Sequence, residues 1–224
     1  MKLYMHPAST TCRPIMLFAA DHGIALEQQV VDLFTGEQFK PNYVAVNPSC
    51  QVPVLEDEGF RLTESSAILK YLADKIGSAE YPRELQARAR VNEMMDWLNT
   101  GFYRSFGYGL CYAQLLEDYK LADPAAQSLA VAAGKRHAER FLRVLEGNLL
   151  AGGRAWLCGD AVTIADYLAS GMISLGEVIG CTYGGYPNIA RWYGRMKDRP
   201  NWRTVNAALY GWAEAARGPA YVTL

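Results

Sequence analysis

Strand-like and helix-like patterns alternate over residues 1–77, whereas residues 84–224 show only the spacing of helices. The first part is predicted to contain strands at 2–5, 27–31, 52–56 and 60–62, helices at 12–22 and 65–76, and an irregular helical segment at 36–46. Residues 77–83 form a turn-rich connection. Beyond it, apolar residues three and four positions apart predict helices at 85–116, 124–150, 164–179, 189–197 and 202–216. We therefore expect a small α/β domain at 1–77, ended by Gly77, and a larger all-α domain at 84–224.

Composition excludes several classes of protein. The 224 residues carry 22 basic and 23 acidic side chains, a net charge of −1, so we expect neither nucleic acid nor a membrane as partner. No apolar run reaches the roughly 18 residues of a membrane span, and the N-terminus lacks the apolar segment of a secretory signal. Five cysteines are scattered without a C-x-x-C pair, and only three histidines are present. A disulfide framework or a metal site is therefore not expected, and a cytoplasmic location is the simpler interpretation.

Ser9, a residue with a small hydroxyl side chain, lies shortly after the first predicted strand. Ser9 lies between this strand and a helix that begins near Cys12, with Pro14 in its first turn. The N–H groups at the start of a helix favour negative charge, so the junction can hold an anion such as a thiolate. Thr10 and Thr11 offer neighbouring hydroxyls, and a plain N-cap is the alternative role of Ser9.

Four short motifs follow one another in a specific order: Ser9-x-x-Cys12-Arg13, Asn47-Pro48, Val52-Pro53 and Glu64-Ser65-x-Ala67-Ile68. Together they resemble the cytosolic glutathione transferases of the serine type, which are the theta- and delta-like classes, and the resemblance covers nearly the whole chain. It implies a thioredoxin-like N-terminal domain that binds glutathione, an all-α C-terminal domain that binds an acceptor, and a homodimer. It also implies a detoxification reaction, in which glutathione is a co-substrate that attacks a small apolar electrophile without help from a metal.

The resemblance assigns a role to each motif. Ser9 holds the glutathione sulfur as a thiolate, because a free thiol has a pKa of about 8.5 and is mostly protonated at neutral pH. Val52 and Pro53 form a cis-proline turn, in place of an ordinary trans proline, and the Val52 N–H and C=O pair with the cysteinyl part of the tripeptide. Glu64 and Ser65 bind the γ-glutamyl group at the start of a helix, where plain capping is the alternative.

The glycine end of glutathione has weaker candidates. The family often carries His and Lys where this chain has Gln38 and Gln51, and neutral donors hold a carboxylate less firmly than charged ones. Lys40 is expected to compensate from the irregular segment, and Cys50 occupies another position that lines the site. This departure predicts weaker glutathione binding than the family norm.

An aromatic run marks the acceptor pocket that the resemblance implies. Five aromatic side chains lie between positions 101 and 112: Phe102, Tyr103, Phe106, Tyr108 and Tyr112. Aromatic walls suit apolar electrophiles, although helically spaced aromatic residues equally fit a protein core. We expect Tyr103 and Phe106 to contact the acceptor and Tyr210 to close the pocket from the last helix. Arg104 is expected on the solvated surface.

Two rival functions stay open at this point. Cys12 lies in the first turn of a helix, where a cysteine can act as nucleophile. The protein would then be a glutathione-dependent thiol–disulfide oxidoreductase of the dehydroascorbate reductase type, although serine-type relatives bury a cysteine here. The second rival is a non-catalytic binding domain on the same fold.

Two further expectations concern structure. Thr163 and Asp166 form the pattern of a capping box at the start of a core helix. Asn92 or Asp96 is expected to reach across the dimer interface, as an acidic residue does in relatives.

Overall fold

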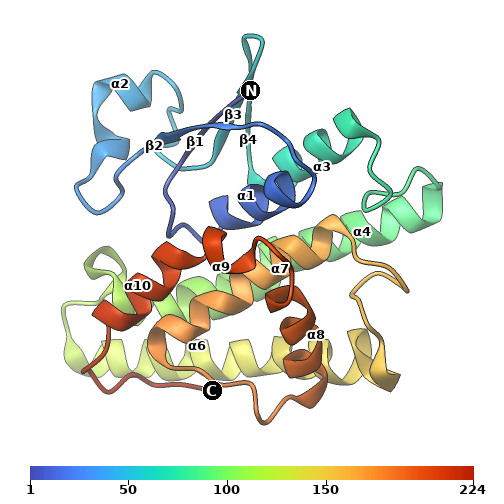
Figure 1. The fold of residues 1–224 in the computed structure, drawn as a ribbon. Coiled ribbons are helices and arrows are strands. Elements are labelled where there is room, and N and C mark those ends of the chain that lie inside the picture. The colour runs from blue at the N-terminus through green and yellow to red at the C-terminus, as the bar shows by residue number, and fades with distance from the viewer.

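The computed structural model describes residues 1–224, and its N-terminal part is built on one four-stranded sheet (Figure 1). The strands are β1 Lys2–Met5, β2 Glu27–Val30, β3 Val54–Asp57 and β4 Phe60–Thr63. They lie in the order β2-β1-β3-β4, with β1 parallel to β2 and antiparallel to β3. Leu3 is paired with Gln28 on one side and with Leu55 on the other. This mixed sheet confirms the thioredoxin-like fold.

Three helices accompany the sheet: α1 Cys12–Asp21, α2 Pro41–Val44 and α3 Ser65–Ile76. The first and third cover the face of the sheet that turns toward the rest of the chain, and α2 lies apart from them (Figure 1). α1 adopts this place because Ile15, Leu17 and Phe18 are buried there. α3 ends where Gly77 takes a φ of +65°, a left-handed conformation that glycine adopts without strain.

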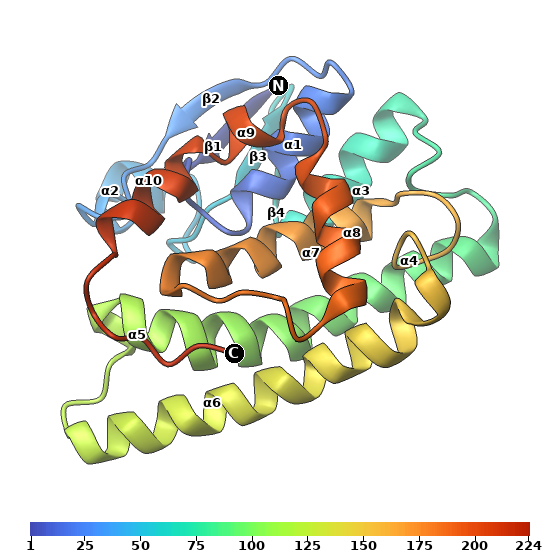
Figure 2. The same ribbon diagram turned by 60° about the horizontal axis from the view of Figure 1, so that its bottom comes forward.

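The remainder of the chain is helical: α4 Leu85–Trp97, α5 Ala113–Leu115, α6 Pro124–Val144, α7 Ile164–Ser174, α8 Pro187–Lys197, α9 Trp202–Val205 and α10 Ala207–Ala215. Figure 2 shows α6 on the outside, α4 next to it, and α7 between α4 and the helices of the sheet part. This arrangement confirms the all-α second part. None of the helices combines the length and apolar character that a membrane crossing requires.

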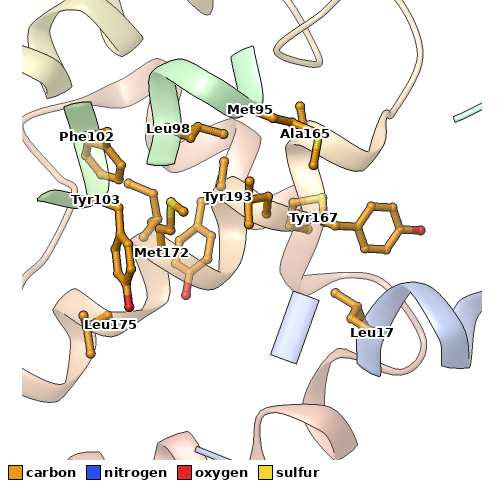
Figure 3. Packing of buried hydrophobic residues seen from close by; sticks show 14 of the residues in the cluster. Leu17, Met95, Leu98, Phe102, Tyr103, Ala165, Tyr167, Met172, Leu175 and Tyr193 are labelled. Atoms are coloured by element: carbon orange, nitrogen blue, oxygen red, sulfur yellow. The ribbon is translucent and has the colours of Figure 1, made fainter. Parts of the chain in front are cut away.

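One apolar core joins the two parts. Leu17 of α1, Met95 of α4 and Tyr167 of α7 belong to a single cluster of 48 buried residues (Figure 3). α7 is its central element, because every residue from Ile164 to Ser174 is buried. The two parts therefore share a continuous core rather than touching at a small polar interface.

The start of α7 is fixed by the predicted capping box, which is confirmed. The Thr163 N–H donates to Asp166 Oδ2 at 2.8 Å, and its hydroxyl donates to the same oxygen at 3.0 Å. Asp166 is fully buried, and its Oδ1 accepts the Leu157 N–H at 3.0 Å and the Trp192 indole N–H at 2.9 Å. One carboxylate thus joins the first turn of α7 to the preceding loop and to α8.

Several predicted helices are interrupted in the structure, and two of these interruptions bear on the rest of the fold. The helix expected over 85–116 changes at Leu98 into wider π-helical turns, which cover Leu98–Phe102 and Arg104–Tyr112. The helix expected over 202–216 breaks at Asn206, whose side chain accepts a hydrogen bond from Arg13 at 2.5 Å. Because Arg13 is buried, this contact ties the end of α9 to α1. The break at Asn206 thus coincides with a tertiary contact, which no local pattern reveals.

Candidate active site

A cleft of about 850 Å³ lies between the sheet part and the helical part. One wall comes from the β1–α1 loop, the turn before β3 and the start of α3, and the other from the π-helical segment and α10. Eight of the predicted site residues line it: Ser9, Gln38, Gln51, Val52, Pro53, Glu64, Ser65 and Tyr103. Lys40, Phe106 and Tyr210 do not. No group of three or more His, Cys, Asp or Glu residues is placed to hold a metal ion.

Ser9 is half-buried in the lining of this cleft, just before α1. Its Oγ accepts the Cys12 N–H at 3.3 Å and lies 3.2 Å from Thr11 Oγ1. Its carbonyl accepts the Arg13 N–H at 3.1 Å. The loop is therefore held against the first turn of α1, and Ser9 presents a hydroxyl to the cleft while it also caps the helix.

The Val52-Pro53 peptide bond is cis, as predicted. The carbonyl of Gln51 accepts the Tyr43 hydroxyl at 2.6 Å and the Asn47 side-chain amide at 2.8 Å, which fixes the turn before β3. The Val52 carbonyl accepts the Thr11 hydroxyl at 3.3 Å, and the Val52 N–H has no acceptor within the chain. This backbone unit can pair with an extended peptide in the cleft.

The start of α3 opens into the same cleft. Glu64 precedes the helix with a φ of +66°, which is uncommon for a residue with a side chain, and its carboxylate does not cap the helix. The first N–H groups of α3, at Ser65 and Ser66, have no carbonyl partner in the chain. These N–H groups can receive a carboxylate, while the exposed Glu64 carboxylate can receive an ammonium group.

The side chains available to a second carboxylate are neutral. Gln38 lines the cleft, and its Oε1 is buried without a hydrogen-bond partner. Cys50 and Gln51 line the same cleft. Lys40 requires a correction: it is exposed and outside the cleft, because it is the residue that caps α2 and its side chain is left in solvent. No lysine or arginine lines the cleft.

The helical wall carries a chain of hydroxyl groups. The Tyr103 and Tyr112 hydroxyls are 2.9 Å apart, and the Tyr112 hydroxyl is 2.8 Å from Thr10 Oγ1. Burial raises the pKa of Tyr103 well above its ordinary value and that of Tyr112 to about 12, so both phenols stay neutral. Because the buried Thr10 hydroxyl is engaged with this wall, Thr10 is a poor candidate for contact with a ligand.

The π-helical turns decide which aromatic rings face the cleft. Tyr108 follows Tyr103 by five positions, and the two ring centroids are 5.0 Å apart. Tyr112 follows by four more, at 5.3 Å from Tyr108, and all three rings line the cleft. Phe106 requires a correction, since it is fully buried and stacks on Phe102 at 5.1 Å (Figure 3 shows Phe102 and Tyr103 on this segment). Wider turns displace residue 106 from the face that an α-helix would give it.

Two close approaches of glycine position this wall. A Cβ on Gly107 would lie 2.5 Å from the Tyr103 ring, so glycine leaves room for that ring across the helix. A Cβ on Gly134 would lie 2.0 Å from the Gly109 carbonyl oxygen. The approach between Gly109 and Gly134 lets α6 and the π-helical segment pack backbone to backbone.

Five aromatic residues in the lining were not predicted: His6, Phe34, Phe39, Tyr119 and Trp212. Phe34 stands between His6 and Trp212, with ring centroids at 5.0 Å and 5.9 Å, and all three line the cleft. Burial lowers the pKa of His6, so its imidazole is neutral at pH 7. Tyr210 requires a correction, because its hydroxyl accepts the Trp202 indole N–H at 2.7 Å and Trp212 takes the expected place in the cleft. His6 and Phe34 come from the loops after β1 and β2, and Trp212 comes from the last helix, so no local motif marks this group.

Cys12 does not have the properties of a nucleophile. Its side chain is fully buried in the core and does not line the cleft. Burial raises the pKa of its thiol to about 11, although the hydrogen bond with Ser9 opposes this shift. A thiol of this kind stays protonated at neutral pH, which argues against the oxidoreductase alternative.

Comparison with known proteins identifies the family. Two family models match, described as "Glutathione S-transferase, N-terminal domain" over residues 1–74 and "Glutathione S-transferase, C-terminal domain" over residues 119–200. Glutathione S-transferase theta-1 of Bos taurus is 34% identical over 200 residues, which cover 88% of this chain and 82% of the relative. The chain belongs to the glutathione S-transferase family.

Solved structures of other glutathione S-transferases have the same fold. A delta-class transferase of Nilaparvata lugens matches with a TM-score of 0.81 and 30% identity, and the alignment covers 96% of this chain and 98% of that chain. Human glutathione transferase theta-2, solved with glutathione and an unknown ligand, matches with a TM-score of 0.84 and 29% identity. That alignment covers 96% of this chain and 89% of the human chain. The theta- and delta-like resemblance noted in the motifs is therefore confirmed.

Proposed function

We propose that this glutathione S-transferase activates glutathione through Ser9 and transfers it to a small uncharged electrophile. The observation that carries the proposal is the convergence of three groups in one cleft: the Ser9 hydroxyl at the start of α1, the free Val52 N–H, and the open start of α3. They match the thiol, the central amide and the γ-glutamyl carboxylate of one tripeptide. The Ser9 hydroxyl donates to the sulfur and favours the thiolate, which then attacks the acceptor.

The walls of the cleft favour an uncharged acceptor. Tyr103, Tyr108 and Tyr112 present aromatic rings opposite the sheet-side wall, and such rings suit polarisable apolar molecules. The charged side chains in the lining are the carboxylates of Glu64, Glu117 and Asp118, without a basic residue. An anionic acceptor would therefore enter against like charge. Substitution at an aryl or alkyl halide and addition to an activated double bond, both detoxification reactions, fit this chemistry.

Neutral side chains at the glycine end support a modest affinity for glutathione. Gln38 and Gln51 can donate hydrogen bonds to its carboxylate, but without the strength that a charged donor adds. We infer that the KM for glutathione is high compared with that of a transferase with basic residues there. Replacing Gln51 by Lys is the direct way to lower it.

Conversion of Ser9 to Ala tests the proposed reaction. Loss of one stabilising donor should lower conjugation of a generic aryl halide at least about tenfold. Ser128→Ala is the matched control, because its hydroxyl donates to the Pro124 carbonyl on the exposed side of α6. Equal turnover of the Ser9→Ala protein and the control would remove Ser9 from the mechanism.

The alternative thiol chemistry has its own test. Cys12→Ala should retain conjugation, and the wild-type protein should form no mixed disulfide between Cys12 and glutathione. A mixed disulfide that is lost in Cys12→Ala and kept in Ser9→Ala would restore the oxidoreductase alternative. A non-catalytic binding domain would show glutathione binding without turnover of any acceptor.

We also propose a homodimer built around α4. A second hollow of about 570 Å³ opens beside this helix, with Trp97 and Leu157 among its lining residues. Asn92 is held by the Tyr81 hydroxyl at 3.0 Å, whereas Asp96 is exposed, so Asp96 is the better candidate to reach the second subunit. Light scattering at several concentrations measures the mass directly, and a monomer throughout would refute the dimer.

Two further expectations, the domain bounds and the cellular location, stay as proposals. The sheet and its helices end at Ile76 and the helical part begins at Leu85, which supports domains at 1–77 and 84–224. The five free cysteines support a cytoplasmic location, where thiols stay reduced.

A further inference from the structure

A continuous chain of hydrogen bonds links Ser9 to the backbone that faces it. The Thr11 hydroxyl donates to the Val52 carbonyl at 3.3 Å, and Thr11 Oγ1 is 3.2 Å from Ser9 Oγ. The Cys12 N–H donates to Ser9 Oγ at 3.3 Å. Ser9, Thr11 and Val52 all line the cleft.

The direction of each proton in this chain follows from counting. A hydroxyl has one hydrogen to donate, and a carbonyl can only accept. The Thr11 hydrogen is used by the Val52 carbonyl, so in the contact between the two hydroxyls Ser9 donates and Thr11 accepts. In the free protein the Ser9 hydrogen is therefore aimed at Thr11 and not at a sulfur in the cleft.

Resting on the function proposed above, we propose that Thr11 is a positioning residue that turns the Ser9 hydroxyl toward the glutathione sulfur when the tripeptide binds. The N–H of the cysteinyl residue of glutathione takes over the Val52 carbonyl, which releases the Thr11 hydrogen. Thr11 then donates to Ser9 Oγ, and Ser9 donates to the thiolate.

The exchange leaves every group satisfied. In the free protein Cys12 donates to Ser9, Ser9 to Thr11, and Thr11 to Val52. In the complex Cys12 and Thr11 both donate to Ser9, Ser9 donates to sulfur, and the ligand donates to Val52. A hydroxyl that accepts two hydrogen bonds is polarised and becomes a stronger donor, because hydrogen bonds in a chain reinforce one another.

Replacing Thr11 by Val tests this role, because valine keeps the shape of the side chain and removes the hydroxyl. The readout is the ultraviolet absorbance of the bound thiolate, followed against pH with saturating glutathione. The midpoint should rise by about 0.5 to 1 pH unit, the size of one ordinary hydrogen bond. Conjugation below the midpoint should fall about three- to tenfold. Thr11→Ser restores the hydroxyl and should give the wild-type midpoint.

A second measurement separates this role from structural damage. Titration calorimetry of Thr11→Val at a pH well below the thiolate midpoint, where glutathione binds as the thiol, should give a Kd equal to or lower than that of the wild type, since the ligand no longer competes with Thr11 for Val52. A damaged site would bind more weakly instead. Thr100→Val is the control, as its exposed hydroxyl donates to the Asp96 carbonyl on the α4 side and should leave both readouts unchanged.

The outcomes are distinct. An unchanged thiolate midpoint in Thr11→Val, or a raised midpoint that Thr11→Ser fails to restore, would overturn the role of Thr11. Weaker glutathione binding in Thr11→Val at a pH well below the thiolate midpoint would overturn the exchange at Val52. Absence of a thiolate signal in the wild-type protein would refute the proposed function itself, whatever the Thr11 variants show.

Discussion

Removing the Asp166 carboxylate is the sharpest test of how the fold supports the cleft. Asp166 is fully buried and accepts four hydrogen bonds, two on each oxygen, from the Thr163 N–H, the Thr163 hydroxyl, the Leu157 N–H and the Trp192 indole. It fixes the start of α7, which packs against both α1 and α4. Disturbing this residue should therefore weaken both parts of the molecule together.

The magnitude follows from the donors left behind. In Asp166→Ala the loss of the cap costs about 1 kcal/mol, and two further buried donors without acceptors, Leu157 N–H and Trp192 Nε1, cost about 1–3 kcal/mol each. The sum is about 5 kcal/mol, the middle of a range of about 3–7 kcal/mol. Asp166→Asn keeps one acceptor oxygen and loses the contact with Thr163. Burial raises the pKa of this carboxyl, so a neutral amide avoids part of the cost of a buried charge, and we expect about 2 kcal/mol.

Thermal unfolding followed by circular dichroism measures the effect, at one protein concentration because association shifts the Tm. For a chain of this size 1 kcal/mol lowers the Tm by about 2–4 °C, so Asp166→Ala should lose about 10–20 °C and Asp166→Asn about 4–8 °C. Asp123 caps α6 through the N–H groups of Ala125 and Ala126 but is exposed, and Asp123→Ala should lose only about 1 kcal/mol. Equal losses in the two Ala variants would refute the argument from burial.

Two further predictions concern the walls of the cleft. Because burial lowers the pKa of His6, the unfolded chain binds a proton that the folded chain excludes, so the free energy of unfolding should fall as the pH drops below about 6.5. His6→Gln should make this fall less steep than it is in the control His137→Gln, whose residue is exposed. Equal slopes of stability against pH in the two variants would contradict the prediction. In Gly107→Ala the new Cβ lies 2.5 Å from the Tyr103 ring and displaces it. The KM for an apolar acceptor should therefore rise severalfold, and the free energy of unfolding should fall by about 1–3 kcal/mol. Gly147→Ala, where no atom lies within 4 Å of the new Cβ, should change neither quantity.

Local patterns sufficed for the parts of the molecule that local physics determines. The order of strands and helices, the stop at Gly77 and the capping box at Thr163 each depend on residues that are close in sequence, whereas the cis bond before Pro53 was predicted from the family resemblance. The binding motifs near Ser9 and Ser65 were recognisable because each lies at the start of a helix. Their presence in one cleft follows from the strand order once the sheet is known.

The acceptor side of the cleft could not be predicted in the same way. An α-helical period puts Tyr103 and Phe106 on one face, whereas the π-helical turns send Phe106 into the core and bring Tyr108 to the cleft. Trp212 reaches the same cleft from the last helix, more than a hundred residues after Tyr103 in the sequence. These placements depend on how the helices pack, which single-sequence patterns do not contain.

A crystal structure of the protein with bound glutathione tests the central claim most directly. The account predicts the sulfur within hydrogen-bonding distance of Ser9 Oγ, with the cysteinyl amide on Val52. A sulfur that contacts Cys12 or Thr10 instead, or a cleft that stays empty at a large excess of glutathione, would contradict it.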